Sequence, residues 1–207
     1  MKSIFVRTSV LALAAVLFFQ VGCAAIKTKS ARFYVLSPMV DVETGKQLAS
    51  GEAGNISISI NPVSLPKYLK KSQIVTRTGN NELHLAEFDR WAGKIEEDIG
   101  RVIAENLAHM LSTDKVLSYP AISAVDTDYT IEMDISRFEG SLGESIELIA
   151  RWAVFDIQEK NVKNITSTRI LESVQGFDYA DMVAAQSRAL ASLSRELADA
   201  IIQLSAK

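Results

Sequence analysis

The sequence predicts an α+β fold, in which two long amphipathic helices pack on one face of a single antiparallel or mixed β-sheet. In two long stretches apolar residues recur every three or four positions, and in several shorter stretches they alternate with polar ones. The chain has 207 residues, 48% of them hydrophobic, which is enough for one domain with a core. We expect a signal peptide at residues 1–22, a tether at residues 23–30 and a single domain at residues 31–207.

Residues 1–22 have the layout of a secretory signal peptide. Lys2 and Arg7 give the start a positive charge, and a short apolar run follows at residues 10–19. This run is too short to span a bilayer whose hydrocarbon core is about 30 Å thick, but it is typical of a signal-peptide core. We therefore expect residues 1–22 to be removed after export.

Cys23 is the only cysteine of the chain and stands where that signal would be cleaved. Small Gly22 precedes it, as in the bacterial lipobox, although Gln20 replaces the leucine that is usual three residues before the cysteine. We expect acyl and diacylglyceryl chains on Cys23 to anchor the protein in a membrane. In the sorting logic of Gram-negative lipoproteins, Ala24 implies the outer membrane, with the domain in the periplasm. The alternative is an ordinary secretory signal followed by an incidental thiol.

Charge and cysteine content exclude several classes of function. Without Lys2 and Arg7, the 22 basic residues fall to 20 against 25 acidic ones, a net charge of −5. This balance argues against nucleic-acid binding and against electrostatic adhesion to anionic lipid. A single cysteine also rules out an intramolecular disulfide and a multi-cysteine metal site.

Four short strands are expected in the first half of the domain, each a run of apolar or β-branched residues bounded by turn-forming or polar residues. They are residues 32–37, 55–61, 73–78 and 81–87. Gly79-Asn80 separates the last two and suits a two-residue hairpin turn, with Gly79 at positive φ. Leu83 and Leu85 fall on one side of the alternation, which we expect to be the buried face.

A helix is expected directly after this hairpin, at residues 89–111. Asp89 is a good N-cap residue, and Trp91 would be the first large side chain on the buried face. Apolar residues then follow at helical spacing: Ile95, Ile99, Val102, Ile103, Leu107 and Met110. Such a stripe indicates a helix that packs on a core.

The second half reads as a short edge strand, a three-stranded meander and a final helix. The strands are expected at residues 116–120, 128–138, 145–157 and 164–172, and the helix at residues 179–204. Gly140 and Gly143 mark the first turn of the meander, and Asp178 can cap the final helix. The seven-residue apolar spacing of that helix would also suit a coiled coil with a partner, but docking on the sheet is the expectation.

Residues with catalytic potential are few. His84 and His109 are the only histidines, and neither has a nucleophile next to it in the sequence. No phosphate-binding loop, esterase elbow or zinc-protease motif is present. We therefore expect no enzymatic activity, no metal and no cofactor other than the lipid on Cys23.

Asp128, Glu132 and Asp134 form the one acidic group of interest, since the period of a strand places them on one face. Arg151 on the next strand could pair with one of them. Three carboxylates could hold a hard cation or act as acid and base, which leaves a small periplasmic hydrolase as an alternative. The solvated outer face of a sheet would look the same.

A partner contact is expected at the segment after the second strand. Leu65, Pro66, Tyr68 and Leu69 stand among prolines and lysines, so we do not expect all of them to be core. Apolar side chains left exposed mark binding surfaces. A buried edge loop is the alternative for this segment.

Four stretches together resemble a known family. Residues 32–37 read RFYVLS, residues 65–69 LPKYL, residues 73–92 QIVTRTGNNELHLAEFDRWA and residues 101–108 RVIAENLA. The pattern resembles that of the ABC-type transport auxiliary lipoproteins, which serve MCE-type lipid transporters. Ser72 departs from it, since proline often stands there, and Gly-Lys-Ile at residues 93–95 replaces an acidic-proline-leucine run.

The resemblance implies a non-enzymatic accessory subunit of a system that moves phospholipids or other lipids between the inner and outer membranes. Its task would be to dock the MCE assembly at the outer membrane. The implied partners are an MCE-domain protein of the periplasm, the outer membrane through the lipid anchor, and further copies of the chain. The alternative is an assembly factor that binds glycolipid directly, which requires an exposed apolar groove.

Overall fold

The computed structural model describes residues 29–39, 56–120, 127–158 and 161–205, with the backbone alone at residues 161, 163 and 164. The chain divides into two compact units, Met1–Ser30 and Ala31–Lys207, and the second carries all the described elements. Cys23 lies outside the described residues.

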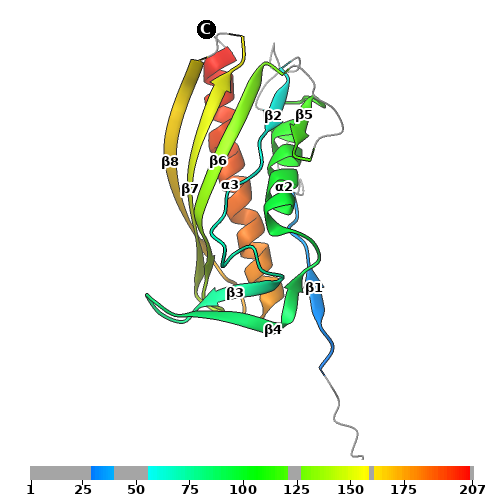
Figure 1. The fold of residues 1–207 in the computed structure, drawn as a ribbon, viewed down its shortest axis with the longest axis vertical. Coiled ribbons are helices and arrows are strands. Elements are labelled where there is room, and N and C mark those ends of the chain that lie inside the picture. Colours follow the sequence, from blue (N-terminus) through cyan, green and yellow to red (C-terminus); the bar gives the residue numbers. More distant parts are fainter. Residues whose placement is uncertain (1–28, 40–55, 121–126, 159–160, 206–207) are drawn as a thin grey trace, which may run out of the picture. The chain divides into compact units, whose positions relative to one another are not determined.

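Two helices and eight strands make up the described part of the second unit (Figure 1). In chain order they are β1 (Arg32–Tyr34), β2 (Ile58–Ile60), β3 (Gln73–Arg77), β4 (Leu83–Trp91), α2 (Ile95–Met110), β5 (Val116–Ser118), β6 (Tyr129–Gly140), β7 (Ser145–Asp156), β8 (Asn161–Ser173) and α3 (Tyr179–Ser205). The expected α+β class is confirmed. The expected single sheet is wrong, because the strands divide into a three-stranded sheet, β1-β4-β3, and a five-stranded sheet, β5-β2-β6-β7-β8.

The five-stranded sheet is built on the long antiparallel meander of β6, β7 and β8, with β2 parallel to both β6 and β5. The expected edge strand and meander are thus confirmed. Helix α3 packs on β7, β8 and α2, so the expected docking of the final helix is confirmed as well. Trp152 of β7 donates its indole N–H to Thr168 Oγ1 at 3.0 Å, and the Thr168 hydroxyl donates to Glu196 of α3 at 2.5 Å.

The final helix begins as the sequence predicts. The Asp181 amide donates to Asp178 Oδ1 at 2.9 Å, and the Asp178 amide donates back to Asp181 Oδ2 at 3.3 Å. This reciprocal pair satisfies two amides at the helix start. The backbone hydrogen bond from Asp181 is the main cause that lowers the pKa of the Asp178 carboxyl.

The expected start of the first helix is wrong. Strand β4 continues to Trp91, and α2 begins only at Ile95, with Lys94 at the N-cap position and no side-chain cap. The reason is a long-range pairing, in which β1 lies parallel to the end of β4 and sets Arg32 opposite Asp89. Three acidic residues in the first turn of α2, Glu96, Glu97 and Asp98, favour the positive end of the helix dipole.

The β3–β4 hairpin also differs from expectation. Its loop has five residues, 78–82, closed by the Thr78 amide on the Glu82 carbonyl at 3.2 Å, and Gly79 does not take a positive φ. Leu85 is 39% exposed whereas Ala86 is buried, so the expected face is wrong at Leu85. A register shift between Gln73 and Val75 interrupts the ladder, so a strict alternation does not hold through the hairpin.

Candidate functional site

The N-terminal segment, residues 32–39, is held by side chains from β4, α2 and α3. The first attachment point of this segment is the buried carboxylate of Asp89 on β4. Arg32 Nε and the Tyr34 hydroxyl both donate to Asp89 Oδ1 at 2.8 Å. The Arg32 guanidinium also lies 5.8 Å from the centre of the Tyr34 ring, within cation–π range. One carboxylate thus binds both polar side chains of β1.

This arrangement shifts the ionisation of both β1 side chains. The pKa of the Tyr34 phenol rises to about 12, first because burial disfavours the phenolate and then because the hydroxyl donates to Asp89. The pKa of the Arg32 guanidinium is also raised, chiefly by its hydrogen bond to Asp89. Tyr34 therefore remains a hydrogen-bond donor well into the alkaline range.

The second attachment point is Leu36, whose backbone is bound by an ion pair on α2. The Leu36 amide donates to Asp98 Oδ2 at 2.7 Å, and Arg101 donates to the Leu36 carbonyl at 2.8 Å. Arg101 and Asp98 are themselves joined by two hydrogen bonds, of 2.6 and 3.0 Å. Both backbone groups of Leu36 are satisfied, and its side chain is buried in the core.

The third attachment point is provided by Asn106 of α2, which is buried. Its Oδ1 accepts the Met39 amide at 2.8 Å, and its Nδ2 donates to Ser194 Oγ of α3 at 3.1 Å. Between these points the Ser37 amide donates to Ser187 Oγ of α3 at 3.1 Å. We call Asp89, Asp98, Arg101 and Asn106 the clasp of the N-terminal segment.

The sequence motifs contain most of the clasp. Asp89 lies in the stretch of residues 73–92, and Arg101 and Asn106 lie in the stretch of residues 101–108. Sequence reasoning singled out these stretches but missed the role of the polar residues in them. The available signal was Asn106, a polar residue at an inward position of the apolar stripe of its helix. A buried amide side chain needs hydrogen-bond partners, so this position indicates a polar contact in the core.

A second polar cluster attaches the small sheet to the large one. Glu139 of β6 has a fully buried side chain and accepts from Arg77 of β3 at 2.5 and 3.0 Å. The Tyr68 hydroxyl lies 3.3 Å from the same carboxylate. Burial, followed by the charge of Glu139, raises the pKa of the Tyr68 phenol, and the hydrogen bond to Glu139 raises that of Arg77.

The cluster continues onto β7 and β8. Arg137 forms an ion pair with Glu147 and lies 3.5 Å from Glu139, and Arg169 donates to Glu147 at 2.5 Å. Three guanidinium groups therefore face two carboxylates. The carboxylates are buried and paired, as a structural junction requires.

The expected partner surface is only partly exposed. Leu65 and Leu69 are 7% and 6% exposed and belong to the core, so the expectation that they face a partner is wrong. Their side chains fill the space between the small sheet, α2 and α3, where they line a small gap with Trp91, Phe138 and Gln186. Pro66 and Tyr68 are half-buried and remain accessible.

Asp128, which directly precedes β6, and Glu132 and Asp134 of β6 do not form one site. Asp128 accepts from the Ser57 amide at 2.8 Å and the Ser57 hydroxyl at 2.7 Å, and these bonds lower its pKa. Glu132 accepts from Asn61 at 3.3 Å instead. Asp134 stands opposite Arg151 in register, but no ion pair within 4.0 Å joins these two described residues.

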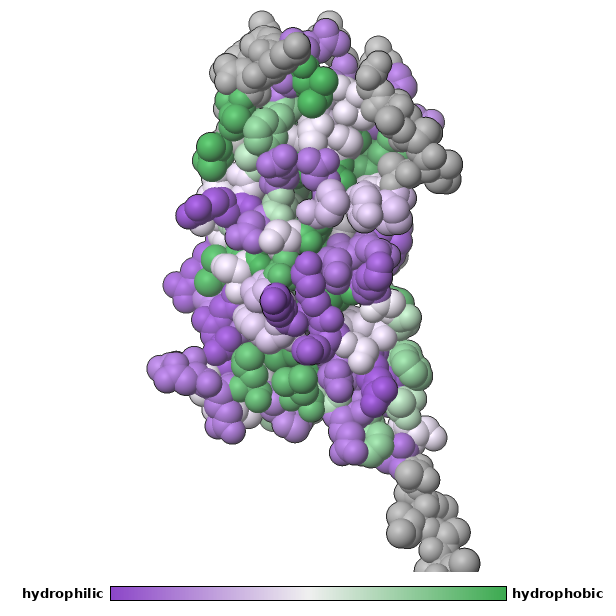
Figure 2. Space-filling model, viewed as in Figure 1, coloured by the Kyte–Doolittle hydropathy of each residue, from purple (hydrophilic) through white to green (hydrophobic). Residues whose placement is uncertain are grey.

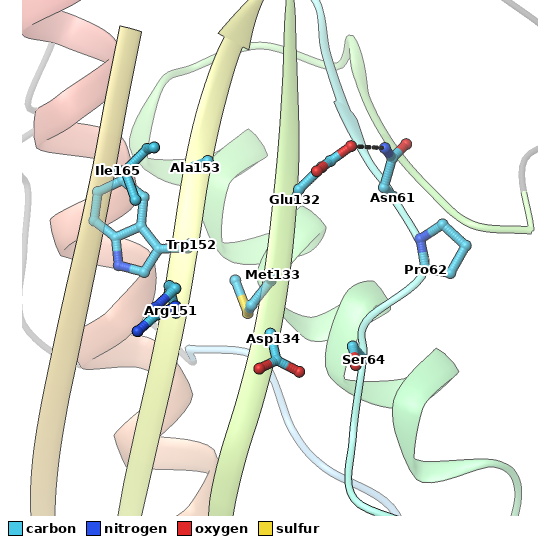
Figure 3. A pocket seen from close by; sticks show the side chains of 10 residues that line it. All are labelled: Asn61, Pro62, Ser64, Glu132, Met133, Asp134, Arg151, Trp152, Ala153 and Ile165. Carbon is cyan, nitrogen blue, oxygen red and sulfur yellow. Dashed lines mark hydrogen bonds between the residues drawn. The ribbon is translucent and has the colours of Figure 1, made fainter. Parts of the chain in front are cut away.

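Glu132, Asp134 and Arg151 line an open groove of about 510 Å³ on the sheet face that points away from the helices. Figure 3 shows Ile165 and Pro62 at its two sides. Within the described ranges, no group of three or more His, Cys, Asp and Glu residues could hold a metal ion. His84 and His109 are both exposed and lie on different elements, β4 and the end of α2. No helix in the described part of the chain is long and apolar enough to cross a membrane.

The chain is similar to proteins with lipoprotein and transport functions. Residues 34–198 match a family model described as the ABC-type transport auxiliary lipoprotein component. The intermembrane transport lipoprotein PqiC of Escherichia coli (strain K12) is 23% identical over 158 residues, which cover 75% of this chain and 82% of that protein. PqiC of Shigella flexneri matches equally.

Two solved structures have the same fold. Protein XCC0632 from Xanthomonas campestris has a TM-score of 0.68 at 17% identity, covering 86% of this chain and 100% of that one. An uncharacterized protein has the same TM-score and identity, covering 84% and 99% of the two chains.

The role of Asp89 can be tested with Asp89→Asn. Loss of the charge-assisted hydrogen bonds to Arg32 and Tyr34 should lower the free energy of unfolding by about 1–3 kcal/mol. Backbone amide exchange should rise at Ala92, whose amide donates to the Tyr34 carbonyl at 2.9 Å. Glu87→Gln, at an exposed position of the same strand, is the matched control. Equal stability and exchange in both variants would show that Asp89 does not hold β1.

The shifted phenol of Tyr34 predicts an alkaline effect on stability. Its pKa is about 12 in the folded chain against 10.0 in an ordinary tyrosine, so between these values the unfolded chain has lost this proton and the folded chain has not. Its contribution to stability is therefore complete below pH 10 and is lost as the pH rises towards 12. Ultraviolet titration should show a late tyrosine ionisation that Tyr34→Phe lacks. Asp89→Asn should shift the ionisation to lower pH, and an unchanged titration in both variants would contradict the assignment.

Proposed function

The chain belongs to the family of ABC-type transport auxiliary lipoprotein components, and from this premise we propose that it is a non-enzymatic accessory subunit of an MCE-linked system that moves lipid between the inner and outer membranes. In this role it docks the MCE assembly at the outer membrane. The observation that carries the proposal is the family match, which spans residues 34–198. The matched range includes nearly all the described elements and the whole clasp. The relative from Escherichia coli is named an intermembrane transport lipoprotein.

The proposal includes a lipid anchor on Cys23. A force applied to that anchor would act first on β1, which begins at Arg32, has only three residues and pairs with β4. Backbone pairing over three residues alone would hold such a strand weakly. The clasp adds bonds at Arg32, Tyr34, Leu36 and Met39 from two elements, β4 and α2. The domain can therefore remain folded while its partner pulls against the membrane.

The proposed partner contact is a revision of the segment that the sequence suggested. Leu65 and Leu69 are excluded because they are core side chains. Pro66 and Tyr68 remain, with the exposed lysines at positions 67, 70 and 71 beside them. Tyrosine is enriched in protein interfaces, and exposed charged side chains such as these lysines suit the polar rim of an interface. This surface would meet an acidic patch on an MCE-domain protein.

The two alternative functions gain little from the geometry. A glycolipid carrier needs an apolar groove, and the groove of Figure 3 places Glu132, Asp134 and Arg151 where acyl chains would lie. Contact of acyl chains with these charged groups is unfavourable. A hydrolase needs its acid and base to converge, but Asp128 is bound to Ser57, whereas Glu132 and Asp134 face the groove. We therefore favour the accessory role.

The anchor can be tested in a Gram-negative host by separating the membranes on a density gradient. The wild-type chain should be found in the outer-membrane fraction and should carry acyl chains by mass spectrometry. Cys23→Ser should leave the chain without them and abolish this location. Ala24→Asp, which should direct the lipidated protein to the inner membrane, is the control for sorting. A wild-type chain without acyl chains, or one in the soluble periplasmic fraction, would overturn the anchor.

The docking role can be tested by affinity recovery from solubilised envelopes of the source bacterium. The lipidated wild-type chain should recover an MCE-domain protein, and Lys70→Glu with Lys71→Glu should reduce the recovery. These lysines are exposed, so their change should leave the fold intact, and Lys115→Glu serves as the charge control. Recovery that is unchanged would discard the proposed surface. Absence of any MCE-domain protein would overturn the docking role itself.

A further inference from the structure

Exposed apolar side chains gather at the end of the domain where the described chain enters β1. Phe33 of β1 is 64% exposed, and Phe177, in the loop between β8 and α3, is 84% exposed. Leu85 of β4 adds a third, partly exposed side chain. Figure 2 shows further apolar residues, in green, where β3 and β4 lie. Exposed aromatic residues from separate elements at one end of a domain indicate a surface that contacts something apolar.

Several contacts place these elements together. The charge of Asp178 contributes to the raised pKa of Arg32, behind the larger effect of Asp89, so the loop before α3 lies near β1. Ser141, in the β6–β7 turn, donates its hydroxyl to the Arg77 carbonyl of β3 at 2.8 Å. In Figure 1 the three-stranded sheet and the start of α3 lie at the same end of the domain.

Phe177 is exposed on a loop that is firmly held. A Cβ atom on Gly143 would lie only 2.3 Å from the Phe177 ring, so the ring rests on the backbone of that turn. Gly143 has a φ of 74°, which a glycine adopts without strain. The Val174 amide donates to the Glu144 carbonyl at 3.0 Å, and Asp178 and Asp181 hold each other on the far side. The exposure of this ring is thus a fixed feature of the fold.

The chain length to the anchor limits what this end can contact. Ala31 stands eight residues after Cys23, so even a fully extended chain spans no more than about 29 Å between them. Helix α3 has 27 residues and is therefore about 40 Å long. Its far end cannot rest on the membrane with the helix upright, because Ala31 would then lie beyond the reach of the tether. The end that carries Phe33 and Phe177 is the one the anchor keeps close to lipid.

We propose that this end of the domain rests on the surface of the membrane that holds the anchor, with Phe33 and Phe177 inserted among the lipid headgroups. This inference depends on the lipidation of Cys23 in the proposed function. Aromatic side chains favour the interface between headgroups and acyl chains. Charge does not drive the contact, because Arg32 is paired with Asp89 and also lies near the negative charge of Asp178. The lipid surface therefore sets the orientation of the domain, and the acyl chains supply the affinity.

The test uses the full lipidated chain in vesicles of phosphatidylethanolamine and phosphatidylglycerol. Its single cysteine carries the lipid, so a cysteine introduced elsewhere is the only free thiol and can take a fluorescent probe. Gln175→Cys places the probe beside Phe177, and Asp199→Cys places it about 30 Å along α3 as the matched control. Both positions are exposed. Nitroxide-labelled lipid should quench the probe at position 175 several times more than the probe at position 199.

The aromatic residues are tested in the same background. Phe33→Ser with Phe177→Ser, added to Gln175→Cys, should reduce the quenching towards the level at position 199, while flotation with the vesicles stays complete. Circular dichroism checks that this variant is folded. If it is not, the single change Phe177→Ser at the exposed ring replaces it, and partial loss of quenching is then expected.

The outcomes separate this inference from the proposed function. A wild-type chain that does not float with the vesicles contradicts the anchor. A chain that floats with equal quenching at both positions keeps the anchor and overturns the orientation. Quenching at position 175 that persists after both serine substitutions would overturn the proposal. The tether alone would then set the distance between the probe and the lipid. A probe shielded from nitroxide lipid and from aqueous iodide alike would show that protein covers this end, which also overturns the proposal.

Discussion

The carboxylate of Asp89 is the group on which the attachment of the N-terminal segment depends. Arg32 and Tyr34 both donate to it, across sequence separations of 57 and 55 residues. A buried carboxylate without these donors would carry a large desolvation cost, so the three groups order each other. Strand β1 has only three residues and could not hold its place by backbone pairing alone. From this point the chain passes to Leu36 and Met39, where α2 supplies further partners.

The two sheets are joined by a different kind of contact. Leu65 and Leu69 fill the junction with apolar side chains, and Arg77 on Glu139 fixes the relation of β3 to β6. The carboxylates of this cluster are occupied by guanidinium groups and by the Tyr68 hydroxyl. In the proposed role, these contacts would keep the two sheets in a fixed relation to one another. The polar residues of the clasp and of this second cluster hold separate elements of the fold together.

The proposed function depends on the surfaces of the domain and on its location in the cell envelope. With the proposed anchor on Cys23, the short tether would keep the end of the domain that carries β1 near the lipid. The half-buried Tyr68 and the exposed lysines beside it remain accessible to the proposed protein partner. An orientation fixed by Phe33 and Phe177 would present that surface in a constant direction, which lowers the entropic cost of docking.

The sequence by itself determined the α+β class, the meander of β6 to β8, the cap of α3 at Asp178 and the family, because local periodicity and extended motifs carry this information. It also supported Cys23 as the anchor, since that residue follows a signal-like segment. Tertiary structure alone decided the division into two sheets, the extension of β4 through Asp89 and the burial of Leu65 and Leu69. A carboxylate before an apolar stripe looks like an N-cap until a distant arginine and tyrosine are seen to bind it. These features depend on pairings between residues far apart in the chain, which no local pattern records.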